Sequence, residues 1–378
     1  MAFQISIMWI PAIILIVFVV ALLIRIPVSF SMALAALVGI VLLGKDLRTI
    51  PQLWSTALKS YTISAIPFFV LAGNIMNTGG ITNRIFNFAR VLVGHIVGGL
   101  GHVIIVACMI FSGISGSFTA DAAGIGTVAK KAMEDQGYER EFGAAIVCAA
   151  SILGPIIPPS ILFIYYGCYT GLSISKLFMA GLIPGIISGL LLMVVCFFMA
   201  RSGNIEAPVF KKAALSDVWI AFKESYLALL APGIIIFGML SGWVTPTEAA
   251  ILACMYSLIV SVIYKELKWN DLPKILLDSA KTSANAQFLV AASSMVSWIV
   301  TVTRVTDLLS GFITSFTTST IVVLIIINIY LIIQGCFLDT TSGLILIMPI
   351  IYPIAMKFGI DPIHFGVIIC YNLILGAL

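Results

Sequence analysis

Long apolar runs separated by short polar connections make up most of the sequence. A helix needs about 20 consecutive apolar residues to cross a bilayer. Runs of this kind predict membrane-spanning helices at 5–24, 26–44, 61–81, 142–170, 174–200, 226–244, 246–264 and 281–301, and a further run starts near residue 362. Amphipathic segments at 46–60, 211–225 and 268–280 are predicted to be connectors at the membrane surface.

Two longer apolar regions, 91–133 and 318–356, are each interrupted by polar residues near their middle. The first interruption runs from Ser112 to Asp121, and the second runs from Gly335 to Ser342. Irregular backbone at membrane depth must be covered by protein or line a cavity. We therefore expect each region to form a re-entrant hairpin whose polar tip lies part-way through the membrane.

The span predicted at 142–170 is broken by the sequence Gly154-Pro155-Ile156-Ile157-Pro158-Pro159-Ser160. Proline lacks an amide donor and disrupts a helix interior, so this segment frees backbone groups in mid-span. In secondary transporters such broken helices bind ions and substrate. The alternative is a kink that serves only helix packing.

The two halves of the chain share residues at a nearly constant offset. Pro27 and Pro246 lie 219 residues apart, whereas Phe142 and Phe365 lie 223 residues apart. Because the same order of features follows this offset, the sequence indicates an internal repeat. Further pairs at the first offset are Ser60 with Ser279, Ser64 with Ser283, Phe69 with Phe288, and Met76 with Met295.

Each predicted repeat contains five crossings and one hairpin, and an odd number of crossings inverts the second copy relative to the first. Repeat 1 is predicted at 1–200, with scaffold helices at 1–90, the first hairpin and broken helix at 91–170, and a closing span at 174–200. After a cytoplasmic linker at 201–225, repeat 2 is predicted at 226–378, with scaffold helices at 226–317, the second hairpin at 318–356 and an incomplete broken helix at 362–378. We expect the last span to be truncated, because the chain ends before a counterpart of Pro158-Pro159.

Basic residues suggest how this arrangement is oriented in the membrane. Those between 201 and 223 and between 265 and 274 flank one pair of spans, and positive charge marks the cytoplasmic side. The first hairpin would then open to the cytoplasm and the second to the outside. The basic residues of the 45–59 loop fall outside in this orientation, and they disagree with it.

Composition supports a membrane protein. Hydrophobic residues make up 61% of the chain and charged residues 10%, and the mean hydropathy is +1.16; a soluble domain of this size needs a more charged surface. The net charge of +4 is spread over loops, so nucleic acid is not an expected partner. The seven cysteines occur singly, which argues against a disulfide framework or a cysteine metal site.

The first hairpin tip is rich in groups that bind a hard cation. Hydroxyls of Ser115 and Ser117, together with carbonyls freed around Gly116, provide oxygen ligands suited to Na⁺ without adding net charge. The alternative is that these small residues only let helices pack closely. The second tip repeats the chemistry with Gly335, Asp339, Thr340, Thr341 and Ser342.

Candidate substrate-binding residues are Asp121, Ser160, Thr341 and Arg304. A carboxylate at membrane depth is costly when unpaired, so Asp121 and Asp339 are candidates for function. The alternative for both aspartates is a helix cap that accepts backbone N–H bonds. Arg304 could pair with an anionic substrate, although anchoring at the membrane interface is the favoured role.

Taken together, these motifs resemble the large membrane subunit of a tripartite ATP-independent periplasmic (TRAP) transporter. The resemblance rests on the hydroxyl-rich tip, the Gly-Pro-x-x-Pro-Pro-Ser break at 154–160, the Gly-Cys-Phe-Leu-Asp tip at 335–339, and Pro67 to Gly73 in the third span. It implies an elevator-type, Na⁺-driven importer of an organic acid in the bacterial inner membrane. A small four-helix membrane subunit and a periplasmic substrate-binding protein would be its partners. By the same resemblance, one Na⁺ site would comprise Ser115, Gly116, Ser117, Gly154 and Pro158, and another Gly335, Asp339 and Thr340.

Two other functions fit parts of the sequence. A stand-alone Na⁺/dicarboxylate carrier would use the same kind of inverted repeat but would need no binding protein. An intramembrane protease would use Gly113-Ile114-Ser115-Gly116 as a nucleophile motif. A serine nucleophile needs a histidine base within reach, and the only histidine downstream of Ser115, His364, lies near the predicted outer end of its span.

Overall fold

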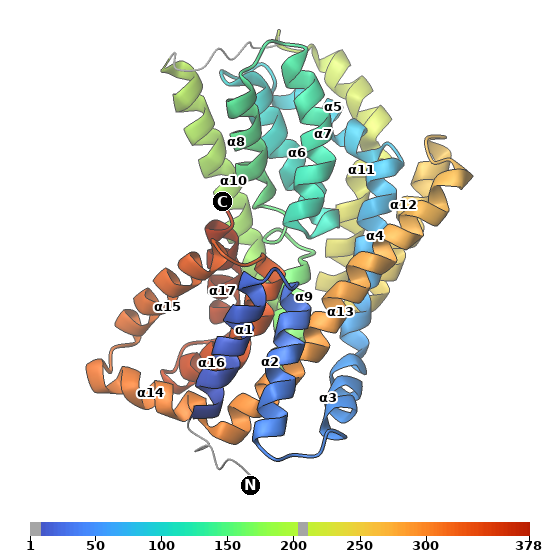
Figure 1. Ribbon diagram of the computed structural model, residues 1–378. Coiled ribbons are helices and arrows are strands. Elements are labelled where there is room, and N and C mark those ends of the chain that lie inside the picture. Colours follow the sequence, from blue (N-terminus) through green and yellow to red (C-terminus); the bar gives the residue numbers. More distant parts are fainter. Residues whose placement is uncertain (1–8, 203–210) are drawn as a thin grey trace. The chain divides into compact units, whose positions relative to one another are not determined.

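The computed structural model describes residues 9–202 and 211–378, and every regular element in these ranges is helical (Figure 1). Within them, five helices are long and apolar enough to cross a membrane, or up to seven when two bent helix pairs each count as one span. The five are α10 (Ile174–Arg201), α11 (Leu215–Leu240), α12 (Pro246–Ile263), α13 (Leu272–Thr303, extended to Trp269 by a short 3-10 turn) and α16 (Thr340–Lys357). The prediction of an all-helical polytopic membrane protein is confirmed.

The bent pairs and the shorter apolar helices account for most of the other predicted spans and for arms of the two predicted hairpins. The bent pairs are α3 (Thr49–Leu58) with η2–α4 (Tyr61–Thr78), and α14 (Val305–Phe316) with α15 (Thr320–Gly335). The shorter apolar helices are α1 (Ile10–Leu23), α2 (Val28–Leu42), α6 (Gly99–Ser115), α9 (Ile161–Thr170) and α17 (Pro362–Gly376). Three more helices complete the described chain: α5 (Ile81–Val93), α7 (Phe118–Glu134) and α8 (Arg140–Ser151).

Two segments predicted as separate connectors differ from the prediction. Helix α11 already starts at Leu215 and α13 at Leu272, so most of 211–225 and 268–280 continues into the following helix. Neither segment contains a residue that would stop its helix after the helix has begun. The one proline, Pro273, lies in the first turn of α13, where proline is tolerated. The segment 46–60 does contain a separate helix, α3, which has no buried residue.

The chain forms two compact units. Unit 1 contains the residues up to Ile63, Tyr165–Leu172 and Lys281–Ala377, whereas unit 2 contains Ser64–Ile164, Ser173–Ala280 and Leu378. Their boundaries therefore run through α9 and α13. Each unit is discontinuous in sequence because helices from both halves of the chain contribute to it.

In unit 2, α6 and α7 form a hairpin that packs against α8, while α4 lies along α12 and α5 along α11 (Figure 1). An ion pair fixes the start of α5 to the end of α12. Arg84 Nη1 lies 2.6 Å from Glu266 Oε1, and the guanidinium lies 3.7 Å from the ring centroid of Tyr264.

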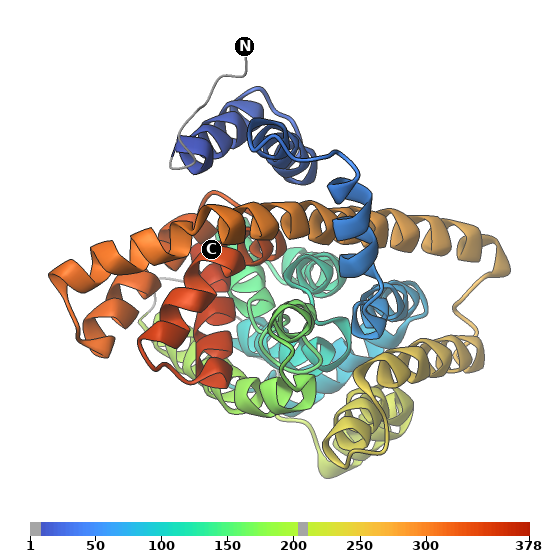
Figure 2. The ribbon, with the colours of Figure 1, turned by 90° about the horizontal axis from the view of Figure 1, so that it is seen from below.

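In unit 1, α15 and α16 form the second hairpin, and both helices pack against α17. Helices α1 and α2 pack against each other, and Figure 2 shows them as a blue pair joined by a short connection. Hairpin, polar tip and following helix thus occur in the same order in both halves. The opposite orientation of the two copies stays a prediction.

Candidate functional site

The first hairpin tip is a sharp reversal at Gly116 and Ser117. Helix α6 ends at Ser115, Gly116 adopts the left-handed conformation with φ 59°, and extended Ser117 precedes α7. Glycine tolerates this conformation without strain. A second constraint also requires glycine, because a Cβ at Gly116 would lie 2.4 Å from the carbonyl oxygen of Pro159.

The side chain of Asp121 lies inside the hairpin tip and is hydrogen-bonded to two serines. Its side chain is fully buried, and Ser112 Oγ donates a hydrogen bond to Asp121 Oδ2 at 2.9 Å. The hydroxyl of Ser115 donates to the other carboxylate oxygen, Oδ1. Both serines belong to the last turns of α6, so the carboxylate at the start of α7 joins the two arms of the hairpin.

The break between α8 and α9 packs directly on this tip. A Cβ at Gly154 would lie 2.5 Å from Asp121 Oδ2 and 3.0 Å from the carbonyl oxygen of Ser117. Ile161 N donates to the carbonyl oxygen of Gly116 at 3.2 Å. Ser160 is buried; its hydroxyl donates to Pro155 O and accepts from Phe163 N, and so it caps α9.

The charge at this position is uncompensated by protein. Asp121 forms no ion pair with a basic side chain in the described ranges, and its side-chain partners there are serine hydroxyls. A buried carboxylate without a positive partner is strongly unfavourable unless it takes up a proton or a cation. Hydroxyl, carbonyl and carboxylate oxygens around a broken helix are a suitable donor set for a cation such as Na⁺.

The second hairpin tip is built differently. Asp339 is exposed and caps α16, accepting from Thr341 N at 3.2 Å and Ser342 N at 3.3 Å. Thr340 is buried beside it. Gly335 lies against α17, where a Cβ would be 2.6 Å from the carbonyl oxygen of Leu373 and 2.8 Å from Gly376 Cα.

Gln334 adds a polar atom to the second tip. Its Nε2 donates to the carbonyl oxygen of Gly343 at 3.0 Å, which ties the two arms of the hairpin together. Its Oε1 is buried and has no hydrogen-bond partner in the described part of the chain. An amide oxygen of this kind is a further possible cation ligand.

The structure thus groups most of the predicted site residues into two places. Ser115, Gly116, Ser117, Gly154 and Pro158 lie at the first tip and the break, within unit 2, together with Asp121 and Ser160. Gly335, Asp339, Thr340 and Thr341 lie at the second tip, within unit 1. Arg304 is exposed and precedes α14 with φ 53°.

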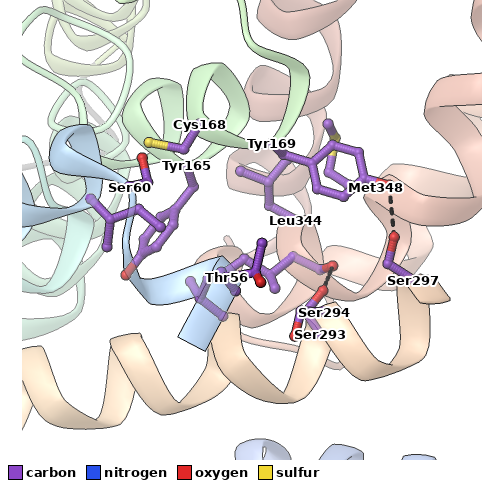
Figure 3. Close-up of a pocket in the computed structure, with 14 residues that line it drawn as sticks. Thr56, Ser60, Tyr165, Cys168, Tyr169, Ser293, Ser294, Ser297, Leu344 and Met348 are labelled. Atoms are coloured by element: carbon purple, nitrogen blue, oxygen red, sulfur yellow. Dashed lines mark hydrogen bonds between the residues drawn. The ribbon is translucent and has the colours of Figure 1, made fainter. Parts of the chain in front are cut away.

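Unit 1 also contains a cavity of about 300 Å³, shown in Figure 3. One face of α9 lines it with Tyr165, Cys168 and Tyr169, and α13 contributes Ser293, Ser294 and Ser297. Thr56 and Ser60 come from α3 and the turn after it, whereas α16 supplies the apolar side chains of Leu344, Ile345 and Met348. The size lies at the lower end of the range for small-molecule pockets.

Comparison with known proteins identifies the family. The family model of the tripartite ATP-independent periplasmic transporter DctM component matches residues 15–378. The chain belongs to this family. It is 39% identical over 355 residues to the sialic acid TRAP transporter large permease protein SiaM of Vibrio cholerae, covering 93% of this chain and 82% of the relative. It is 37% identical over 351 residues to the C4-dicarboxylate large permease DctM of Pseudomonas aeruginosa, covering 92% and 82%.

The fold also has a counterpart among solved structures. The YdaH transporter of Alcanivorax borkumensis, whose crystal structure is described as having an unusual topology, superposes with a TM-score of 0.60. Sequence identity is 12%, and the match covers 87% of this chain and 78% of that chain. At this identity the similarity concerns the fold alone.

Membership in a family of transporter permeases shows that this TRAP permease is not an enzyme. The hydroxyl of Ser115, the nucleophile of the protease alternative, is hydrogen-bonded to Asp121 instead of to a histidine. The resemblance inferred from the hairpin tips and the proline break is confirmed.

Sequence reasoning missed three features of the permease. Gln334 precedes the glycine of the second tip, but its orphaned oxygen depends on how α15 packs against α16. The serines of α13 lie in a run that reads as an ordinary span. Tyr165, Tyr166 and Tyr169 directly follow the proline break, and this cluster of tyrosines was the available signal for the cavity.

Proposed function

We propose that this permease imports an organic acid across the bacterial inner membrane and couples the import to Na⁺. The observation that carries the proposal is the buried tip of the first hairpin. There Asp121, serine hydroxyls and backbone carbonyls meet the break at Gly154 without a basic side chain. Such a site gains from a bound cation, and a cation gradient can then drive transport.

The proposed sodium sites follow the two tips. Ser115, Gly116, Ser117, Gly154 and Pro158 would hold one Na⁺, and Gly335, Asp339 and Thr340 would hold another. We add Asp121 to the first site, because its buried carboxylate contacts Ser115 and would repel an anionic substrate. Ser160, Thr341 and Arg304 remain proposed substrate-binding residues.

The proposed partners are a small four-helix membrane subunit and a periplasmic binding protein. The sialic acid TRAP permease SiaT of Haemophilus influenzae is longer than this chain, which covers only 59% of it. We take the additional length of that permease as support for a direct association of the large subunit with the small one. The isethionate permease of Oleidesulfovibrio alaskensis carries the composite name DctMQ, and this chain covers 57% of it. In such relatives the two membrane components can be fused.

An elevator-type movement is part of the proposal. A mobile part that holds both hairpins would move against a scaffold made of the early spans of each half. The hairpins fall in different compact units, so the division into units does not by itself support this movement.

Transport assays in proteoliposomes test the proposal. The large and small subunits are reconstituted with the binding protein, and uptake of sialic acid, a C4-dicarboxylate and 2,3-diketo-L-gulonate is followed with an inward Na⁺ gradient. We expect at least one acid to accumulate with Na⁺ and to fall to background when K⁺ replaces Na⁺. Equal uptake in K⁺ would contradict Na⁺ coupling, and no uptake of any acid would contradict the substrate class.

A further inference from the structure

The cavity of unit 1 is polar but has no charged side chain among the described residues that line it. Hydroxyl groups converge on it from α3, α9 and α13, which are far apart in the sequence. Figure 3 shows Tyr169 of α9 directed towards Ser297 of α13, and the two hydroxyl oxygens lie 3.3 Å apart. Neither hairpin tip contributes its predicted sodium ligands to this lining.

Tyr165 is the reason to regard the cavity as a binding site. Its side chain is 4% exposed, and its hydroxyl has no hydrogen-bond partner among the described residues. Leaving a buried polar group unpaired costs about 1–3 kcal/mol. Such groups are rare in folded proteins unless water or a ligand satisfies them.

The other hydroxyls restrict what that ligand can be. Ser293 Oγ donates to the carbonyl oxygen of Ile345 at 2.9 Å, and Ser294 Oγ donates to that of Ala291 at 2.7 Å. Thr56 Oγ1 donates to the carbonyl oxygen of Gln52 at 2.9 Å. A hydroxyl has one hydrogen and two lone pairs, so these groups still accept hydrogen bonds but no longer donate them.

We propose that this cavity binds the uncharged, hydroxyl-bearing part of the transported acid, and that the substrate is therefore a polyhydroxylated (sugar) acid. The proposal rests on the function proposed above and specifies its substrate class. Substrate hydroxyls donate to the lone pairs of Thr56, Ser293 and Ser294, and one of them pairs with the Tyr165 hydroxyl. The apolar side chains of α16 contact the carbon chain.

A carboxylate does not suit the same cavity. Its oxygens only accept hydrogen bonds, as do Thr56, Ser293 and Ser294, whose hydrogens are already donated. The described lining also has no basic side chain to balance the charge. Burying an ionised carboxylate without a positive partner is unfavourable by several kcal/mol. The acidic end of the substrate therefore lies outside the cavity.

Two acids of equal length test the proposal. Gluconate and hexanoate are both six-carbon monoacids and differ only in the hydroxyl groups of gluconate. Equilibrium binding of each is measured on the complex of large and small subunits in lipid nanodiscs, without the binding protein, so that the permease alone sets the preference. The variants are Tyr165→Phe, which removes one hydroxyl, and Tyr330→Phe on α15 as a matched control outside the cavity.

We expect the wild type and Tyr330→Phe to bind gluconate at least tenfold more tightly than hexanoate. Tyr165→Phe should lose about tenfold in gluconate affinity and leave hexanoate binding unchanged, in keeping with the cost of one lost hydrogen bond. Equal binding of the two acids by the wild type, no binding of either, or an unchanged preference in Tyr165→Phe would overturn the proposal.

Two further results separate this inference from its premises. The cavity could instead bind Na⁺. In that case Ser293→Ala would raise the Na⁺ concentration needed for half-maximal uptake and leave the preference for the hydroxylated acid intact. That result would overturn the inference. Failure of the uptake assay with every acid contradicts the proposed function, whereas uptake restricted to acids without hydroxyls contradicts the cavity's role alone.

Discussion

Asp121 and Gly154 show how single residues define the first tip. The carboxylate of Asp121 is held by two serine hydroxyls of α6, and the missing side chain of Gly154 leaves room for it. A charge this deeply buried is costly in a membrane. We therefore test the negative charge of Asp121 and the space left by Gly154 with separate substitutions.

Replacing the charge of Asp121 tests its part in ion binding. Asp121→Asn keeps the shape of the side chain but removes the negative charge, so we expect the Na⁺ concentration for half-maximal uptake to rise at least tenfold. The measurement is initial uptake against Na⁺ concentration in proteoliposomes. Asp361→Asn is the matched control, because Asp361 only caps α17, accepting from Ile363 N and His364 N. An unchanged Na⁺ dependence in Asp121→Asn would mean that this aspartate serves the hairpin alone.

A methyl group at Gly154 should disturb the same site by a steric clash with Asp121. The Cβ of Gly154→Ala would approach Asp121 Oδ2 to 2.5 Å, and the serine hydroxyls restrict how far that carboxylate can move. Overpacking of this kind costs about 1–3 kcal/mol, and we expect uptake at low Na⁺ to fall about tenfold. Gly233→Ala is the control, since a Cβ there meets nothing within 4 Å. Equal uptake by the two variants would show that the tip can relax around the methyl group.

Among the helices, the close crossing of α15 and α17 depends on two glycines. Gly335 and Gly376 face each other, and a Cβ on either would meet backbone atoms of the other helix at less than 3 Å. Small residues at such crossings allow helices in a membrane to approach closely. Backbone atoms cannot turn aside as a flexible side chain can, so the helices themselves must separate.

We expect Gly335→Ala to lower the melting temperature of the purified protein, at a cost of about 1–3 kcal/mol from overpacking. Gly311→Ala in α14 is the control, because no atom lies within 4 Å of the position that its Cβ would occupy. Alanine also has the better helix propensity, so the control should be neutral or slightly stabilising. The measurement is thermal unfolding in detergent. A drop of equal size in both variants would contradict the packing argument.

For the whole molecule, family membership predicts dependence on other components. A stand-alone carrier and a TRAP permease share hairpins and broken helices, but only the latter receives its substrate from a periplasmic protein. The match to the DctM component covers residues 15–378, which favours the TRAP system.

We expect uptake in proteoliposomes to fall to background when either the small subunit or the binding protein is left out. The large subunit alone, supplied with free substrate at the same concentration, serves as the comparison. A heat-treated binding protein controls for carry-over of substrate. Undiminished uptake by the large subunit alone would instead identify a stand-alone carrier.

The sequence alone determined the class of fold and the position of its irregular segments. Apolar runs about 20 residues long specify membrane helices. Three prolines within five residues, from Pro155 to Pro159, break a helix through local effects, because each lacks an amide donor. For this reason the hairpin tips and the proline break are where the pattern predicted them. The local pattern also gave a wrong prediction. The polar segments 211–225 and 268–280 were predicted as separate connectors, but most of each belongs to the following helix, α11 or α13.

Only the tertiary structure decided which polar groups have partners. The burial of Asp121 against Ser112 and the exposure of Asp339 could not be told apart in the sequence, since both aspartates begin the second arm of a hairpin. The unpaired hydroxyl of Tyr165 likewise depends on α3, α9, α13 and α16 meeting around one cavity. Hydrogen-bond satisfaction is a property of contacts between distant segments, and a one-dimensional pattern does not encode it residue by residue.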